Sequence, residues 1–190
     1  MNDIIIDNKS FSGIDFSIDK IAIADYETCT FSNCIFQNCN LSNINFTDCK
    51  FLNCDLSMAI IKNTSFKTVY FKNCKLLGLH FYDCNAFLLT LDFEGSMLNL
   101  ASFNKVKLKG IKFKKCRLQE TDFTQADLTN SLFHECDLSG AIFQGTLLEK
   151  ADFRTSWNYS IDPEINRIRK AKFSIEGVRG LLNKYNIDIE

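Results

Sequence analysis

One sequence feature constrains the fold of this chain more than any other: a hydrophobic residue recurs at every fifth position. Reading from Phe11 in steps of five gives fifteen apolar residues through Phe81, and a second series with the same step runs from Leu88 to Phe153. Together the two series include 16 of the 18 phenylalanines. Because this period matches neither the 3.6 residues of an α-helical turn nor the two-residue repeat of a strand, neither element could bury the whole series on one face.

The residues that flank each apolar centre follow a pattern of their own. The residue two positions before a centre is mostly small, which suits a tight interior. Two positions after it lies a turn former in many units: Asn33, Asn38, Asn43, Asn53, Asn73, Gly110, Gly140 and Gly145. Each unit therefore reads as one short side plus one corner, and four sides close a square coil of about 20 residues, stacked at the strand spacing of about 4.8 Å. We predict an all-β solenoid, a right-handed quadrilateral β-helix of about seven coils that spans residues 1–155.

The cysteines indicate how the two series join. All nine lie two residues before a position of the five-residue repeat, where we expect small inward-facing side chains. Taking one position from each coil, with a step that is longer by two across the break, gives a single column of Cys34, Cys54, Cys74, Ser96, Cys116 and Cys136. We interpret the two-residue phase slip near 82–87 as a bulge at a corner that leaves the following coils in register.

A structural zinc site is the alternative reading of so many cysteines. Zinc requires four ligands that converge on one point. Thiols in neighbouring units point to different sides of the square, and thiols in neighbouring coils stack in a line. Buried packing is therefore the favoured role, and we expect no metal and no cofactor.

Candidate catalytic groups are scattered. His80 and His134 flank different centres far apart along the rod, where side chains point to solvent. Carboxylates recur just before a centre because the repeat places them there, and no glycine-rich nucleotide-binding motif occurs. An interior filled by the centres leaves no deep pocket. We therefore expect a protein that is not an enzyme, has no catalytic residues and works through its outer surface.

Charge is uneven along the rod. Residues 1–60 hold 8 acidic and 3 basic side chains, residues 61–120 hold 4 and 11, and residues 121–155 hold 6 and 2. A run of lysines is most often a solvated face, but it could also dock an acidic protein or, less readily, nucleic acid. The candidate partner-binding residues are four from the basic belt and four from the acidic zone that follows it: Lys107, Lys109, Lys112, Lys114, Asp122, Asp127, Asp137 and Asp152.

The tail, residues 156–190, differs in kind because the beat stops after Phe153. Asp162 followed by Pro163 is typical of a helix start, and Ser174 can cap a second helix. We predict a short C-terminal α-helical cap that covers the open end of the solenoid. Its apolar residues are also the candidate interface of a two-fold homodimer: Ile175, Val178, Leu181, Leu182 and Tyr185.

The amino-terminal segment has neither the basic start nor the uninterrupted apolar run of a signal peptide, and no stretch has the length to span a membrane. We expect a cytoplasmic protein without membrane contact.

Specific residues carry a family resemblance over nearly the whole chain. Units such as Ala-Asp-Leu-Thr-Asn at 126–130 and Cys-Asp-Leu-Ser-Gly at 136–140 resemble those of pentapeptide-repeat proteins. Asn-Tyr-Ser-Ile-Asp at 158–162, Ala-Lys-Phe-Ser at 171–174 and Ile-Asp-Ile at 187–189 are similar to the Qnr, MfpA and AlbG group of that family. This resemblance implies a rod, dimeric through C-terminal helices, that imitates duplex DNA and protects bacterial DNA gyrase and topoisomerase IV from quinolones or albicidin. With its repeat almost uninterrupted, the chain looks closest to AlbG.

Simple electrostatics limits the kind of DNA mimicry that we expect. Duplex DNA carries one negative charge per about 1.7 Å, so a faithful copy about 35 Å long would need about 20 negative charges. Residues 11–155 hold 16 acidic and 15 basic side chains. We therefore expect mimicry of shape with local acidic zones, and no direct binding of nucleic acid. The alternative is an interaction scaffold with a different partner.

Overall fold

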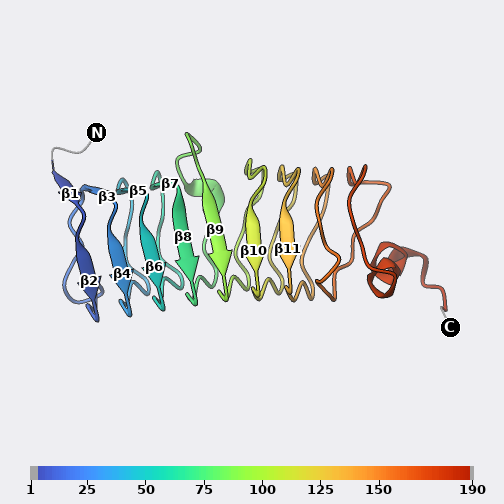
Figure 1. Ribbon diagram of the computed structural model, residues 1–190, viewed down its shortest axis with the longest axis horizontal. Coiled ribbons are helices and arrows are strands. Elements are labelled where there is room, and N and C mark those ends of the chain that lie inside the picture. The colour runs from blue at the N-terminus through green and yellow to red at the C-terminus, as the bar shows by residue number, and fades with distance from the viewer. Residues whose placement is uncertain (1–3, 189–190) are drawn as a thin grey trace.

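The computed structural model describes residues 4–188, which form a rod of stacked coils (Figure 1). Two parallel sheets run along it. One has the order β1-β3-β5-β7, and the other has the order β11-β10-β9-β8-β6-β4-β2. The strands of the first are β1 (Ile5–Asp7), β3 (Asp25–Glu27), β5 (Asn45–Thr47) and β7 (Ser65–Lys67). Those of the second are β2 (Ser10–Ser12), β4 (Thr30–Ser32), β6 (Lys50–Leu52), β8 (Val69–Lys72), β9 (Leu91–Glu94), β10 (Lys112–Lys114) and β11 (Leu132–His134).

The strand register shows the repeat of the coil directly. Tyr26 in β3 pairs with Ile6 in β1, and Phe31 in β4 pairs with Phe11 in β2, so each pair is separated by the four units of one coil. Isolated parallel bridges, such as Asp15 with Ile35 and Asn40 with Ile60, join the coils on the two remaining sides. The predicted four-sided parallel β-solenoid is therefore confirmed.

A continuous stack of nine phenylalanine rings forms the spine of the core. Successive ring centroids lie 4.5 to 5.5 Å apart, and the ring planes are inclined by 3° to 18°. The rings belong to Phe11, Phe31, Phe51, Phe71, Phe93, Phe113, Phe133, Phe153 and Phe173. From Phe93 onward, rings from the opposite side meet this stack edge-on, for example Phe103 against Phe113 at 5.9 Å. Stacked and edge-to-face contacts both add to the apolar burial of these rings.

The corners depend on backbone with positive φ. Every turn former that the sequence pattern places two residues after a centre adopts it, with φ between 53° and 74°. Other residue types do so at equivalent corners, Lys105 and Gln125 among them. Asn and Gly tolerate this conformation best, and stacked asparagines also bond to each other, as Asn63 Nδ2 does to Asn43 Oδ1 at 2.9 Å.

The small residues two positions before each centre do more than fill space. The Sγ of Cys54 donates to the carbonyl oxygen of Phe31 at 3.3 Å, and the Oγ1 of Thr121 donates to that of Leu98 at 2.9 Å. Burial raises the pKa of Cys49 to about 12, which keeps this thiol neutral and able to donate. Cysteine, serine and threonine at this position thus satisfy backbone carbonyl groups inside the rod.

The phase slip occupies a loop between β8 and β9, visible beside these strands in Figure 1. Phe71 pairs with Phe93, two positions later than the spacing between the other coils requires, so the loop absorbs the extra length. A 3-10 turn, η1 (Phe81–Asp83), begins it. We expected Leu88 to point inward, but its side chain is 61% exposed and its backbone has a φ of 57°. The prediction was wrong because the extra residues carry the chain outward at this position, and Leu91 is the next residue to be fully buried.

The solenoid extends beyond residue 155. Parallel bridges join Trp157 to Asp137 and Lys172 to Asp152, and Phe173 stacks on Phe153 with centroids 5.5 Å apart. The expectation of a helical segment from residue 156 is therefore wrong for residues 156–173. Asp162 does accept a hydrogen bond from the backbone of Glu164 at 2.8 Å, but it caps a turn and not a helix.

The predicted α-helical cap is instead two short 3-10 segments, η2 (Glu176–Leu181) and η3 (Asn183–Tyr185). Ser174 caps the first as expected, because its Oγ accepts the backbone N–H of Gly177 at 3.0 Å. Two glycines within this short segment disfavour a regular α-helix, and a segment of this length gains little from cooperativity. Ile189, in the last tail motif, lies outside the described residues.

We predict that Phe113→Ala destabilises the protein by about 3–5 kcal/mol, because it removes one ring from the middle of the stack and leaves a cavity. Urea unfolding followed by circular dichroism measures the loss. Phe87→Ala is the matched control, since this ring is 67% exposed, and it should change stability by less than about 0.5 kcal/mol. Equal effects of the two substitutions would contradict the account of the core.

Candidate interaction surfaces

The rod presents four sides to solvent, and we number them in chain order. Side 1 carries β1, β3, β5 and β7, and side 2 carries the seven-stranded sheet. Side 3 is the bridge column from Asp15 to Trp157, and side 4 contains the bridges Asn40 to Ile60 and His80 to Ile142. Any binding function of the repeat region must use side chains on these sides and on the corners between them.

The eight candidate partner-binding residues are distributed around the rod and do not form one patch. Bridges place Lys107 and Asp127 together on side 1 after the slip, whereas Asp137 lies on side 3 and Asp122 on side 4. The remaining four residues lie on the two sides that carry the sheets. Lys109 is on side 1, and Lys112, Lys114 and Asp152 are on side 2.

The four candidate aspartates have a structural role at the turns. Each accepts the backbone N–H of the residue two positions later, at 2.8 Å for Asp122 and 3.2 Å for Asp127, Asp137 and Asp152. Asp137 also accepts hydrogen bonds from Gln119 at 2.7 Å and Asn158 at 2.9 Å, which link three coils. A short side chain that bonds its own turn is a common way to fix such a corner.

These bonds change the acidity of the aspartates. Burial raises the pKa of Asp137, but hydrogen bonds from Ser139, Asn158 and Gln119 outweigh that effect and bring its pKa below the usual value. The pKa values of Asp122 and Asp127 are lowered in the same way, against burial. In Asp152 the main cause of the lowered pKa is the guanidinium of Arg154. The carboxylates are thus held in their charged form by the fold itself.

The basic belt is partly neutralised by ion pairs between coils. Lys109 lies 3.4 Å from Asp127, Lys112 lies 3.6 Å from Asp92, and Lys115 lies 3.7 Å from Glu135. In each of these pairs at least one side chain is exposed to solvent, so the pair contributes less than about 1 kcal/mol to the stability of the fold. Among residues 4–188, Lys105, Lys107 and Lys114 make no ion pair, so the free positive charge is smaller than the sequence count indicates.

A second charged surface, which we call the N-terminal acidic zone, was not among the sequence candidates. It consists of Asp7, Asp25, Glu27 and Asp48 on side 1 and its corner. Strand pairing sets Asp7 beside Glu27 and Ile5 beside Asp25, and the backbone of Asp48 bonds to that of Lys67 in the next coil. The period of the coil was the signal that could have found it, because Asp7, Glu27 and Asp48 occupy nearly the same place in successive coils.

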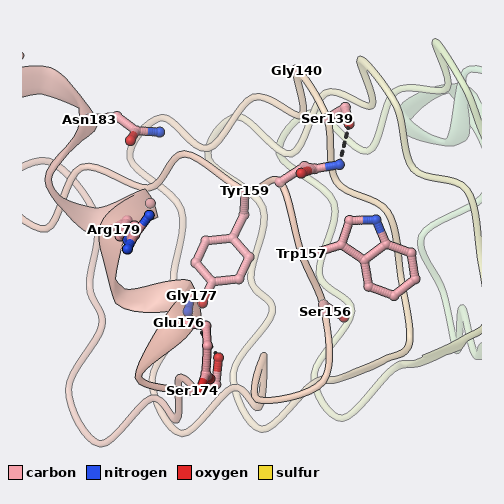
Figure 2. A pocket seen from close by; sticks show the side chains of 12 residues that line it. Ser139, Gly140, Ser156, Trp157, Tyr159, Ser174, Glu176, Gly177, Arg179 and Asn183 are labelled. Carbon is pink, nitrogen blue, oxygen red and sulfur yellow. Dashed lines mark hydrogen bonds between the residues drawn. The ribbon is translucent and has the colours of Figure 1, made fainter. Parts of the chain in front are cut away.

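The C-terminal end of the rod is closed by Tyr159 and the η2 segment (Figure 2). The Tyr159 ring is 3% exposed and lies against Phe153 and Phe173. Figure 2 shows it reaching toward Gly177, where an added Cβ would be 2.0 Å from the tyrosine oxygen; at Gly180 an added Cβ would be 2.2 Å from the tyrosine carbonyl oxygen. The two glycines therefore allow η2 to lie directly on the last coil, and the backbone of Ile161 bonds to Gly180 at 2.9 Å.

The five candidate dimer residues divide into two groups. Leu181 is partly buried against the core of its own chain, and Leu182 is also partly buried. Ile175 and Val178 are 88% and 42% exposed, and Tyr185 is half exposed with its hydroxyl bonded to Glu164 at 2.9 Å. The solvent-facing apolar surface of η2 is thus formed mainly by Ile175 and Val178.

The described residues contain no group of three or more His, Cys, Asp or Glu side chains that could hold a metal ion. His134 is engaged on the surface, with contacts of 3.1 Å to Thr155 and 3.2 Å to Glu135, and His80 stacks on Tyr82. Within the same residues, no helix is both long and apolar enough to cross a membrane.

We predict that Asp137→Asn destabilises the protein most above about pH 4 and progressively less below it. A carboxylate whose folded pKa is lowered stabilises the fold above its unfolded pKa of about 3.9, and this contribution is lost as pH falls through the folded value. Unfolding free energies measured from pH 7 to pH 2.5 give the difference between wild type and variant. A difference that stays constant across this range would contradict the prediction. Asp19→Asn, whose carboxylate makes no hydrogen bond among residues 4–188, should cost less at pH 7.

We predict that Gly180→Ala detaches the C-terminal segment from the rod, because the new methyl group would overlap the backbone of Tyr159. Hydrogen exchange should show faster amide exchange in residues 174–188 and unchanged protection in the coils before Trp157. Gly110→Ala is the control: its φ of 74° makes alanine unfavourable at that corner, but the added Cβ meets no atom within 4 Å, so exchange in residues 174–188 should stay unchanged. Unchanged exchange in the tail of the Gly180 variant would count against the closure that we describe.

Comparisons with known proteins agree with this geometry. The model of the family described as "Pentapeptide repeat region" matches residues 24–99 and 85–156. No curated protein matches the sequence. Among solved structures, full-length QnrB1, a plasmid-mediated fluoroquinolone resistance protein, is 20% identical with a TM-score of 0.46, and the match covers 96% of this chain and 100% of that one.

Two cyanobacterial structures also match. HetL, a pentapeptide repeat protein involved in heterocyst differentiation regulation from Nostoc sp. strain PCC 7120, is 16% identical with a TM-score of 0.50, and the match covers 92% of this chain and 86% of that one. Rfr23 from Cyanothece 51142 is 15% identical with a TM-score of 0.27, over 74% of this chain and 84% of that one. At these identities the likeness concerns the fold alone. With its family model matched over most of the sequence and its four-sided parallel coils, the chain belongs to the pentapeptide repeat family.

Proposed function

We propose that this protein is a non-enzymatic binding protein that occupies the DNA-binding surface of a bacterial type II topoisomerase, DNA gyrase or topoisomerase IV. By doing so it would keep the enzyme from being trapped on DNA by a drug or toxin such as a quinolone or albicidin. The observation that carries the proposal is the combination of a straight rod with an acidic zone on one side. The tail motifs similar to those of the Qnr, MfpA and AlbG group support a type II topoisomerase as the partner.

The shape of the rod supports the proposal. Nine stacked levels, from Phe11 to Phe173, are separated by eight steps of about 4.8 Å, so the repeat region is about 38 Å long. Its width varies little, because each coil has the same four sides. A groove that accepts duplex DNA is long, open at both ends and basic, and such a rod can lie in it.

The charge of the rod determines which part binds. Inter-coil ion pairs reduce the free positive charge in the middle of the rod, with Lys72 3.0 Å from Glu94 and Lys75 3.5 Å from Asp55 as further examples, but this part remains basic. The N-terminal acidic zone presents several carboxylates on one side. A basic groove would therefore be contacted first through side 1 of the first three coils, where electrostatic attraction also speeds association.

The tail contributes a second element of the proposal. The residues that resemble the Qnr, MfpA and AlbG group close the rod: Tyr159 and Ile161 are buried, and Phe173 completes the ring stack. We propose that two rods associate through the exposed surface of η2 about a two-fold axis. Such a homodimer would double the rod length and present an acidic zone at each far end.

The supercoiling reaction of purified gyrase tests the main proposal. At micromolar concentration, the protein should preserve supercoiling in the presence of a quinolone or albicidin, or inhibit it in their absence. Replacing Glu27 and Asp48 with lysine should weaken the effect at least ten-fold, because two charge reversals turn attraction into repulsion.

The matched control replaces Lys112 and Lys114 with glutamate, which reverses the same number of charges on side 2. This variant should retain most of the effect. Absence of any effect of the wild-type protein, with or without drug, would overturn the proposal. If gyrase is unaffected while another protein is captured from a host lysate, the chain is an interaction scaffold for a different partner.

We predict that the protein in solution has the mass of a dimer and that Ile175→Glu with Val178→Glu converts it to a monomer, because both side chains are exposed and apolar. Light scattering after size-exclusion chromatography measures this mass. Ile23→Glu, at an exposed isoleucine near the other end, is the control and should leave the mass unchanged. A dimer that survives the double substitution would exclude η2 as the interface.

A further inference from the structure

A pocket of about 500 Å³ lies beside the loop that absorbs the phase slip. Its apolar wall includes Phe81, Val106 and Leu89, and the loop residues Cys84 and Ala86 line it from the other side. We expected no deep pocket in a rod whose interior is filled by its centres. One pocket nevertheless forms at the phase slip, where Leu88 points to solvent and Leu89 is only partly buried against the core.

The mouth of this pocket is basic. Lys105 and Lys107 line it, and no Asp or Glu is among the residues that do. Within residues 4–188 these two lysines form no ion pair, unlike Lys109, which is 3.4 Å from Asp127. The neighbouring acids are Asp83, next to Cys84 in the sequence, and Asp127, which is the bridge partner of Lys107 but is paired with Lys109. An apolar wall with two unpaired ammonium groups at its edge is complementary to a flat apolar molecule that carries one negative charge.

The size of the pocket also indicates the kind of ligand. Sites for small molecules usually have volumes of roughly 300–1,000 Å³ and a mainly apolar lining with a few polar groups that orient the ligand. The present pocket fits this description within a single chain. Tyr82 and Asn104 complete the lining and offer an aromatic face and an amide.

We propose that this pocket binds a small aromatic carboxylate, with the ring against Phe81, Val106 and Leu89 and the carboxylate between Lys105 and Lys107. This binding site is separate from the N-terminal acidic zone and from η2, and it does not depend on the proposed action on a topoisomerase. A ligand there would contact both the loop and the following coil, and would therefore hold the loop against the rod.

Cys84 provides a built-in reporter of occupancy. It is partly exposed and lines the pocket, whereas the other eight cysteines are buried. Burial, followed by the charge of Asp83, raises the pKa of Cys84, so alkylation should be slow enough to follow by mass spectrometry. A bound ligand should slow it further by covering the thiol.

The experiment measures iodoacetamide alkylation of Cys84 in the native protein against increasing 1-naphthoate, with calorimetry as an independent measure of binding. We expect saturable protection by 1-naphthoate and at least ten-fold weaker protection by 1-naphthylmethylamine, which carries the opposite charge. Lys105→Gln with Lys107→Gln should weaken 1-naphthoate binding roughly ten-fold, the usual size for loss of a charged hydrogen bond. Lys114→Gln, a lysine outside the pocket, should not.

A second pair of variants tests the position of the ligand. Ala86→Trp should fill the pocket and abolish binding, whereas Phe87→Trp, at the adjacent residue that does not line the pocket, should leave binding intact. Circular dichroism confirms that both variants are folded. The proposal is overturned if naphthoate gives no saturable protection at millimolar concentration, if the amine binds equally well, or if Ala86→Trp binds as tightly as Phe87→Trp.

Discussion

Everything in this structure depends on the way in which one coil rests on the next. A coil of four short sides has no stability of its own, because each side chain that points inward needs its equivalents in the coils above and below to cover it. The nine-membered stack from Phe11 to Phe173 is the clearest expression of this dependence. Backbone bonds between coils and donors such as Cys54 and Thr121 satisfy the polar groups that the rings leave inside. The period of five is thus a packing requirement.

This requirement leaves the outer positions free to differ, and it explains how one fold can carry unrelated surfaces. Even so, many outer residues are not free. Asp137 joins three coils and fixes a corner, and some lysines of the belt, such as Lys109, pair with acids one coil away. Three surfaces remain accessible to a partner: the N-terminal acidic zone, the apolar side of η2 and the pocket by the slip loop. Even in the acidic zone, Asp7 and Asp25 accept hydrogen bonds from Thr28 and Asn45 of the next coil. The number of charged residues in a stretch of sequence is therefore larger than the number whose charge is available to a partner.

Much of this architecture could be predicted from the sequence, since the period identifies the inward residues and the Asn and Gly positions identify the corners. The failures arose where the period ends. Leu88 lies on a position of the five-residue repeat, but its side chain is exposed to solvent. Spacing alone does not show on which side of an insertion the chain leaves the rod. Residues 156–173 were expected to be helical, but they form a further coil. Tyr159 and Ile161, which lie off the five-residue step, help to hold this coil, together with Phe173, which lies on the step 20 residues after Phe153. The pocket by the slip loop could not be foreseen, because it depends on the path of the inserted loop residues, which the five-residue spacing does not determine. The acidic zone could have been found by comparing equivalent positions in successive coils.

The central claim is that the rod takes the place of duplex DNA on a type II topoisomerase, and direct competition tests it most closely. Fluorescence anisotropy of a labelled duplex bound to the DNA-binding core of gyrase would be measured while the protein is added. The account predicts that the anisotropy falls to the value of free DNA, and that added salt weakens the competitor because the acidic zone drives binding. Formation of a ternary complex, in which the protein binds gyrase while the duplex stays bound, would contradict it.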